Sequence, residues 1–263
     1  MTESVQLRFT GTLATLTLNR PETHNAFDAA LIAELDAALQ AVANSDARVL
    51  VLTGAGATFS AGADLHWMRG MAKASEVENF DDAMALARCL RRLNTLAIPT
   101  IARVNGSAYG GGVGLLSCCD IALAVDSAKF TLSEVKLGLV PAVISPYVID
   151  AIGKRQARRY MLSAEMISAK TAKEIGLVHE CLPANALDET LERLLHWLGK
   201  GGPLAIADAK SMIQQHRECV TDAEVMAQDR GNAERIARLR VSAEGQEGLS
   251  AFLEKRPARW IKS

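Results

Sequence analysis

The feature that most constrains the fold is a series of apolar segments that alternate with helical patterns. Residues 48–54 read RVLVLTG, and the runs TIARV at 100–104 and DIALAV at 120–125 have the same strand-like character. Asp28 is expected to cap a helix between such strands. Its apolar residues recur every three to four positions: Leu31, Ile32, Leu35, Ala38, Leu39 and Val42. Strands that alternate with helices predict a βα architecture.

The two ends of the chain extend this prediction. VQLRF at 5–9 and LATLTL at 13–18 are expected to be strands, and residues 60–72 and 77–96 to be helical at least in part. From about Ser145 onward nearly all of the pattern is helical. The fold class is therefore α/β, with a helical C-terminal part.

Charge and hydropathy limit the class of partner. The 263 residues include 29 basic and 30 acidic side chains, which give a net charge of -1. No global field favours a nucleic acid or an anionic membrane surface, so neither is expected as a partner. No apolar run approaches the roughly 18 residues of a membrane span, and MTESVQLRFT lacks the design of a signal peptide. A cytoplasmic location is expected.

The cysteines and histidines indicate no metal site. The five cysteines are scattered without CxxC spacing, which is typical of reduced thiols in a reducing compartment. His216 and Cys219 form only a weak pair, which is expected to lie on a helix surface. GAGATF follows a strand as a dinucleotide-binding loop would, but Phe59 stands at its third glycine position. Neither a metal nor a nicotinamide cofactor is expected.

Two glycine-containing loops are the strongest sign of chemistry. The stretch VNGSAYGGGVGL follows a strand, and glycines that end a strand and begin a helix leave amide N–H groups unscreened for an anion such as a developing enolate. These glycines could equally serve close packing of a helix on a sheet. FSAGADL at 59–65 also follows a strand. Two such loops at neighbouring strand ends could supply the two converging N–H donors of an oxyanion hole.

Several motifs in a fixed order resemble the crotonase, or enoyl-CoA hydratase/isomerase, superfamily. They are LTLNRPETHNAF, LTGAGATFSAGADL, IARVNGSAYGGGVGL, EVKLGLVP, ISAKTAKEIGLVHECLP and FLEKRPARW. The resemblance implies a spiral of ββα repeats in residues 1–195, with the CoA and acyl pocket, and a helical trimerisation region in 196–263. It also implies a homotrimer or dimer of trimers, and no cofactor beyond the coenzyme A of the thioester substrate.

The resemblance also implies roles for individual residues. The amides of Ala63 and Gly111 would hold the thioester oxygen, and Glu134 would be the catalytic acid/base. The remaining positions would contact the acyl group or coenzyme A: His24, Ala26, Ala61, Asp64, Leu65, Gly110, Gly114 and Val143.

This chain departs from the straight-chain hydratases at one catalytic position. Those enzymes carry two glutamates beside the substrate double bond, whereas here Gly114 stands at the first position and Glu134 at the second. The glycine is expected to make room for a branched or carboxylated acyl group. An apolar pocket that includes Val140, Val143 and Ile144 is expected to raise the pKa of Glu134. GGGVGL with SEVKLGLVPAVISPYV resembles hydratases of 3-methylglutaconyl-CoA or isohexenylglutaconyl-CoA, in leucine and acyclic terpene breakdown.

Other functions remain open on the same scaffold. A Delta3-Delta2-enoyl-CoA isomerase also works with a single carboxylate, and further acyl-CoA lyases and hydrolases share the fold. A non-enzymatic acyl-CoA-binding subunit is an alternative from another class. For a distal carboxylate on the substrate, Arg69 and Arg103 are the candidate partners, and His66 is a further side chain near the acyl group.

Overall fold

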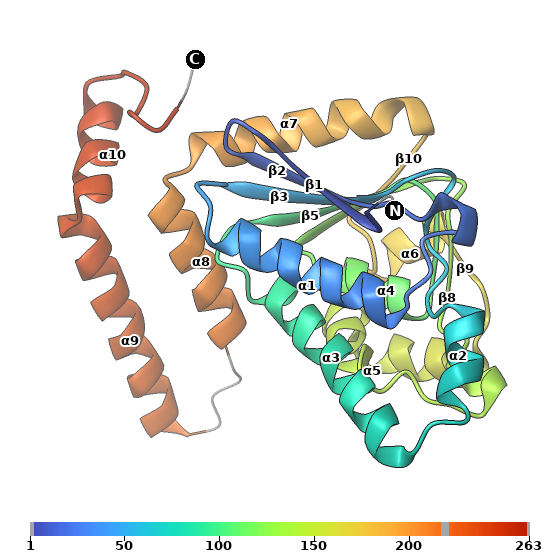
Figure 1. Ribbon diagram of the computed structural model, residues 1–263. Helices are drawn as coiled ribbons and strands as arrows, with labels where there is room; N and C mark the ends of the chain where they lie inside the picture. Colours follow the sequence, from blue (N-terminus) through green and yellow to red (C-terminus); the bar gives the residue numbers. More distant parts are fainter. Residues whose placement is uncertain (1–2, 217–220, 262–263) are drawn as a thin grey trace. The chain divides into compact units, whose positions relative to one another are not determined.

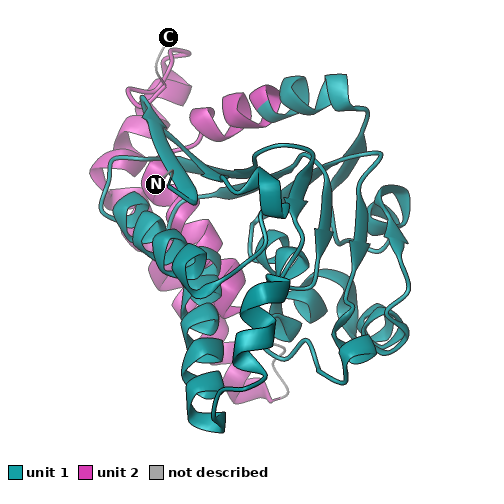
Figure 2. Ribbon diagram, turned by 45° about the vertical axis from the view of Figure 1, so that its right-hand side comes forward, with its two compact units in different colours: residues 1–191 teal, residues 192–263 magenta. Residues whose placement is uncertain are grey.

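The computed structural model describes residues 3–216 and 221–261. The chain forms two compact units, residues 1–191 and 192–263, and the boundary falls within one helix, α7 (Leu187–Lys200) (Figure 2). Cys219 lies outside the described residues.

The first unit is built on a six-stranded sheet in the order β1-β2-β3-β5-β7-β10 (Figure 1). The hairpin of β1 and β2 is antiparallel, and all the later pairings are parallel. The strands are β1 (Val5–Thr10), β2 (Leu13–Leu18), β3 (Val49–Gly54), β5 (Thr100–Val104), β7 (Ile121–Val125) and β10 (Glu180–Leu182). Parallel strands need crossover connections, and the helices of this unit supply them.

A smaller four-stranded sheet has the order β4-β6-β8-β9. Its strands are β4 (Thr58–Ser60), β6 (Ser107–Tyr109), β8 (Lys129–Thr131) and β9 (Ile167–Ser168). Each of β4, β6 and β8 follows a strand of the large sheet after a short turn. The turns after β3 and β5 therefore lead into neighbouring strands, because β4 pairs with β6.

The helices of the first unit follow the patterns in the sequence. The Asp28 side chain caps α1 by accepting from the Leu31 amide, and the apolar face of this helix is buried. The helical segments are η1 (Pro21–Thr23), α1 (Ala29–Ala43), α2 (Leu65–Met71), α3 (Glu76–Asn94), α4 (Gly111–Ser117), η2 (Glu134–Leu137), α5 (Ser145–Ser163), α6 (Ala169–Glu174) and η3 (Ala184–Ala186). The prediction of an α/β fold is confirmed.

The second unit contains only helices among its described residues. After the end of α7 come α8 (Pro203–Gln215), α9 (Asp222–Val241) and α10 (Ala243–Leu253). Within the unit, Glu244 accepts hydrogen bonds from the amides of Leu204 and Ala205, at 2.9 and 2.8 Å, and so joins the start of α10 to the start of α8. No described helix of the chain is long and apolar enough to cross a membrane.

The prediction of a nearly all-helical region after Ser145 holds except at two short strands. β9 and β10 are short strands at the edges of the two sheets. Two or three residues show no period in the sequence, so the pairing of these segments with β8 and β7 depends on tertiary contacts.

Gly106 is one of the positions where a side chain would meet backbone. It is buried in the turn between β5 and β6, and a Cβ atom there would overlap the Ala57 carbonyl group. We expect Gly106→Ala to lower the free energy of unfolding by about 1–3 kcal/mol, because overpacking against backbone forces a shift. Urea unfolding measures this effect.

Gly70→Ala is the matched control in the same unit. A Cβ atom at Gly70 meets nothing within 4 Å, and the residue lies in α2. Its replacement should be neutral or stabilising by up to about 1 kcal/mol, because alanine is the better helix former. Equal effects of the two substitutions would show that the contact with Ala57 is not a constraint.

Candidate active site

Asn105 ties together the two turns that end β3 and β5. Its Oδ1 accepts from the Gly54 amide at 3.0 Å, and its Nδ2 donates to the Gly56 carbonyl at 2.9 Å. The side chain amide thus satisfies backbone groups of the neighbouring turn, which strand pairing leaves unpaired. The Asn105 side chain therefore fixes the position of the turn after β3 relative to the turn after β5, and these two turns lead to the loops at 59–65 and 109–111.

Asn25, in the segment before α1, also hydrogen-bonds to the turn that follows β3. The side chain is fully buried, and its Nδ2 donates to the carbonyls of Ala55 and Thr58, at 2.9 and 2.8 Å. Its backbone carbonyl accepts from Ser60 Oγ at 2.9 Å, and the Gly62 amide donates to that hydroxyl. The segment before α1 and the loop at 59–65 are therefore one hydrogen-bonded structure.

The Ala63 amide is exposed by this arrangement. Phe27 donates from its amide to the Gly62 carbonyl at 2.6 Å and accepts from the Asp64 amide at 2.8 Å. These bonds form a single parallel β-bridge between Phe27 and Ala63, in which the N–H and C=O groups of Ala63 itself point away from Phe27. Ala63 is exposed, and its N–H has no acceptor within the described ranges.

The Gly111 amide lies beside the same loop. A Cβ atom on Gly62 would be 2.6 Å from the Tyr109 carbonyl oxygen and 3.5 Å from the Gly111 nitrogen. Gly62 also has φ of +80°, so both its conformation and its surroundings require glycine. Gly111 begins α4, and among the residues that the structure describes its N–H has no acceptor either. The structure thus brings the two predicted loops into contact.

Glu134 brings a further carboxyl group to these loops. It begins η2, after β8, and its Oε1 lies 3.1 Å from where a Cβ atom of Gly110 would be. Its Oε2 is the one buried side-chain oxygen or nitrogen without a hydrogen-bond partner in the described part of the chain. Desolvation raises the pKa of Glu134 above its usual value, and a hydrogen bond from its own backbone amide opposes the shift only in part.

Gly114 does not open space for a substrate, contrary to the expectation from the sequence. A Cβ atom on Gly114 would overlap the side chain of Ile144, which is 3% exposed. The room left by the glycine is therefore filled by Ile144. Of the other expected pocket residues, Val143 is half-buried, whereas Val140 is 70% exposed and provides no enclosed apolar wall.

The residues expected to contact coenzyme A lie on the adjoining loops. His24 is exposed, with Nδ1 at 3.1 Å from Thr58 Oγ1, and its carbonyl accepts from the Ala61 amide. Ala26 is buried, and Leu65 is 75% exposed. Together with Asp64 these residues belong to the two segments that the Phe27 bridge joins.

Asp64 has a structural use that the motifs did not indicate. Its carboxylate caps α2 by accepting from the amides of His66 and Trp67, and it lies 3.6 Å from Arg20. Arg20 also donates to the Ala26 carbonyl and to Asp28. Sequence reasoning missed Arg20 and Asn25, because only the tertiary structure brings their partners together.

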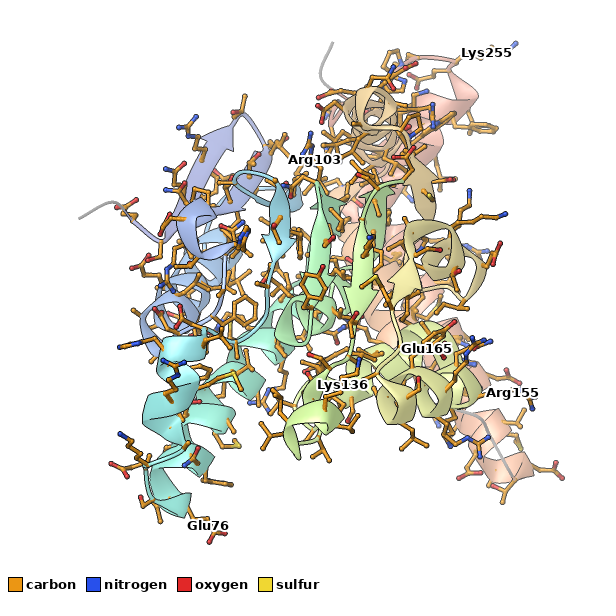
Figure 3. All side chains as sticks on the ribbon, turned by 90° about the vertical axis from the view of Figure 1, so that its right-hand side faces the viewer. Glu76, Arg103, Lys136, Arg155, Glu165 and Lys255 are labelled. Carbon is orange, nitrogen blue, oxygen red and sulfur yellow. The ribbon has the colours of Figure 1, made fainter. Side chains whose placement is uncertain are left out.

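Arg103 is not available for a substrate carboxylate. It forms a two-point ion pair with Asp188, with Nε–Oδ1 at 2.6 Å and Nη2–Oδ2 at 3.0 Å. Figure 3 shows Arg103 near one end of the strands and Lys136, two residues after Glu134, near the other. Arg69 lies on α2 and is exposed.

The arrangement can perform acyl-CoA chemistry with backbone amides and one carboxylate. Two N–H groups on adjoining loops can stabilise a thioester enolate oxygen, and a carboxyl group of raised pKa can accept and return a proton. No group of three His, Cys, Asp or Glu side chains in residues 3–216 and 221–261 could hold a metal ion.

Comparison with known proteins identifies the family. The model of the enoyl-CoA hydratase/isomerase family matches residues 8–263. The 2,3-dehydroadipyl-CoA hydratase of Escherichia coli is 35% identical over 92% of this chain and 92% of its own. A short-chain-enoyl-CoA hydratase of Clostridium acetobutylicum is 29% identical over 99% of this chain and 98% of its own.

A solved structure agrees with these relatives. The crystal structure of an enoyl-CoA hydratase from Shewanella pealeana is 43% identical, with a TM-score of 0.93 over 98% of this chain and 96% of that one. These matches confirm the expected crotonase-like fold and an enzyme of the enoyl-CoA hydratase class. The chain belongs to the enoyl-CoA hydratase/isomerase family.

Proposed function

We propose that this enzyme adds water across the 2,3 double bond of a branched enoyl-CoA, of the 3-methylglutaconyl-CoA or isohexenylglutaconyl-CoA type. The observation that carries the proposal is the carboxylate of Glu134: its Oε1 lies beside Gly110, and its Oε2 is buried without a hydrogen-bond partner. A buried oxygen without a partner is costly for the fold, and a substrate or water can supply the missing hydrogen bond.

The proposed reaction uses one carboxylate twice. The N–H groups of Ala63 and Gly111 donate to the thioester oxygen, while Glu134 accepts a proton from the water that attacks C3. The C3–O bond forms as the electrons of the double bond move toward the thioester and give an enolate. Glu134 then returns the proton to C2, so that the net change is the addition of one water molecule.

The preference for a branched or carboxylated acyl group has two supports. Gly114 stands where a second glutamate would be expected in a straight-chain hydratase. The E. coli relative is named for a substrate with a second carboxyl group, 2,3-dehydroadipyl-CoA. With Arg103 paired to Asp188, Arg69 is the proposed partner for a distal carboxylate. His24, Ala26, Ala61, Asp64 and Leu65 are the proposed contacts of the coenzyme, and Gly110 and Val143 of the acyl group.

A Delta3-Delta2-enoyl-CoA isomerase is the second candidate. The single carboxylate favours it, because moving one proton between C2 and C4 needs no second group. Absorbance separates the two activities. An isomerase converts a 3-enoyl-CoA into the conjugated 2-enoyl-CoA and raises the absorbance of the conjugated system, whereas a hydratase consumes that system.

We also propose that the second unit assembles the chain into a homotrimer or a dimer of trimers, in the cytoplasm. The support is its set of exposed large apolar side chains, since patches of this kind mark interaction surfaces. They include Trp197, Leu204, Ile213, Met226, Val241, Leu249, Phe252 and Leu253. Sedimentation equilibrium tests the proposal, and a monomer at all concentrations would contradict it.

The substrate is tested by hydration of crotonyl-CoA, 3-methylglutaconyl-CoA and isohexenylglutaconyl-CoA by the purified enzyme. We expect the highest kcat/KM with one of the two branched substrates. Faster hydration of crotonyl-CoA would contradict the proposed substrate class.

Glu134→Gln tests the catalytic carboxylate. The substitution keeps the shape of the side chain and removes its proton transfer, so kcat should fall by about 10²- to 10⁴-fold with little change in substrate affinity. Exposed Glu174→Gln is the control and should keep its kcat. A Glu134→Gln enzyme that kept more than about a tenth of wild-type kcat would move the chemistry to another group.

The raised pKa of Glu134 also predicts a dependence of stability on pH. Below the usual glutamate pKa of 4.5 the group is protonated in both the folded and the unfolded chain, so Glu134→Gln should change the Tm little. Above the raised pKa of the folded state, the wild-type enzyme carries a desolvated charge that the variant lacks. The variant should therefore be the more stable protein at pH 8, as measured by thermal unfolding, and an equal Tm at pH 8 would contradict the desolvation of Glu134.

A further inference from the structure

Arg20 contacts both of the segments that the single β-bridge joins. Its Nη1 donates to the Ala26 carbonyl at 3.1 Å and to Asp28 Oδ2 at 2.6 Å. Its Nη2 lies 3.6 Å from Asp64 Oδ2. The first two partners stand on either side of one bridge residue, and the third directly follows the other bridge residue. The guanidinium group thus holds the bridge from both of its segments.

The two carboxylates divide their oxygens between a helix and the guanidinium group. Asp28 Oδ1 accepts from the Leu31 amide at 2.8 Å and caps α1, while its Oδ2 faces Arg20. Asp64 Oδ1 accepts from two amides in the first turn of α2, at 2.8 and 3.1 Å, and its Oδ2 also faces Arg20. The starts of the two helices are therefore joined through one arginine, whose planar fork presents several donors at fixed angles.

This group of charges is set into the protein. The side chains of Arg20, Asp28 and Asp64 are 18, 28 and 15% exposed. The Arg20 backbone is held as well, because its amide donates to Asn25 Oδ1 at 2.9 Å and its carbonyl accepts from the Asn25 amide at 2.8 Å. Partly buried charges are screened less than exposed ones, and a charge-assisted hydrogen bond is stronger than a neutral one. We therefore expect the arginine to keep one position.

The bridge determines where the Ala63 N–H points. The Gly62 carbonyl accepts from the Phe27 amide at 2.6 Å. This carbonyl and the Ala63 N–H belong to one planar trans peptide unit, so the two groups point in opposite directions. A bond that holds the carbonyl therefore also aims the N–H, and a hydrogen bond weakens steeply as its angle closes. Arg20 is bonded on both sides of Phe27 and so fixes the donor on which this direction depends.

We propose that Arg20 is a positioning residue, which holds the bridge between Phe27 and Ala63 so that the Ala63 N–H stays aimed at the thioester oxygen. The inference rests on the proposed function, because that function assigns this N–H to the oxyanion hole. Arg20 acts through the backbone and through two carboxylates. Its removal leaves the N–H in place but free to turn, and a donor that must reorient stabilises the developing charge less.

Arg20→Met keeps the long apolar stem and removes all of these bonds. We expect kcat to fall by about tenfold with little change in KM, because the donor is misaimed and not lost, and loss of one oxyanion-hole donor costs about 10²- to 10³-fold. Arg20→Lys keeps the charge without the fork, so it can pair with one carboxylate at a time and should give an intermediate kcat. A folded Arg20→Met enzyme with the wild-type kcat would overturn the role of Arg20.

Asp64→Asn keeps the test usable where the methionine variant folds poorly. The asparagine oxygen can still cap α2, whereas its amide nitrogen replaces the oxygen that faces Arg20. We expect kcat to fall here too. Combined with Arg20→Lys, the loss should be smaller than the product of the two single losses, because the residues form one linked pair. Losses that multiply would contradict the link.

Arg92→Met is the matched control. Arg92 forms a two-point ion pair with Asp36 of α1, with Nε–Oδ1 at 2.7 Å and Nη2–Oδ2 at 3.3 Å. This pair lies about two turns along α1 from Asp28. Its loss should lower the Tm and leave kcat unchanged. An equal fall in kcat would show that any arginine ion pair on α1 has this effect, and would contradict a specific role of Arg20.

Enolate binding separates this inference from the proposed reaction. Acetoacetyl-CoA loses a proton to give an enolate whose charge is shared by the thioester oxygen, and absorbance reports the enolate fraction without turnover. The wild-type enzyme should raise this fraction at fixed pH, and Arg20→Met should raise it less, with unchanged affinity for butyryl-CoA, which is not ionised at that pH. This pattern without any hydration would contradict the proposed reaction and support the role of Arg20. Hydration with equal enolate fractions in the two enzymes would overturn the role of Arg20 alone.

Discussion

The backbone contact between residues 59–65 and 109–111 is the constraint on which the site depends. Gly62 allows it, because any side chain there would meet the Tyr109 carbonyl at 2.6 Å. Two buried or half-buried asparagines keep the contact in place by satisfying carbonyl and amide groups of the turns, Asn25 from before α1 and Asn105 from the end of β5. The short parallel strands β4 and β6 continue the same alignment. The geometry of the loops is thus determined by main-chain packing more than by the side chains that surround them.

Unlike the hydrogen-bonded groups of these loops, the Glu134 side chain is not fully satisfied. Its carboxylate has an unpartnered oxygen and a raised pKa, both of which cost stability when the group is ionised. The fold tolerates this cost at one position, while the carboxylates nearby are satisfied. Asp64 caps α2, and Asp28 caps α1 and pairs with Arg20. This contrast between an unsatisfied carboxylate and satisfied neighbours is the electrostatic sign of a functional group.

The sequence was sufficient for the strands β1, β2, β3, β5 and β7 of the large sheet and for the meeting of the two loops. Continuous apolar runs predicted β3, β5 and β7, and the glycines after β3 and β5 predicted accessible amides. The short strands β4, β6, β9 and β10 were not predicted, since they have no period of their own and depend on their partners. Ile144 and Gly114 are thirty residues apart, so the contact that fills the space over the glycine requires the packing of α5 on α4. For the same reason the sequence did not indicate the ion pair between Arg103 and Asp188, which are 85 residues apart.

The single β-bridge between Phe27 and Ala63 connects the segment before α1 directly to the loop at 59–65. Both of its hydrogen bonds involve the backbone of Phe27, and the Phe27 ring also lies where a side chain of Gly111 would be, at 3.0 Å. A displacement of the segment around His24 would therefore be transmitted to the Ala63 amide through two short bonds and to α4 through the aromatic ring. A ligand that held the segment around His24 in place would therefore also restrict the Ala63 amide and the start of α4.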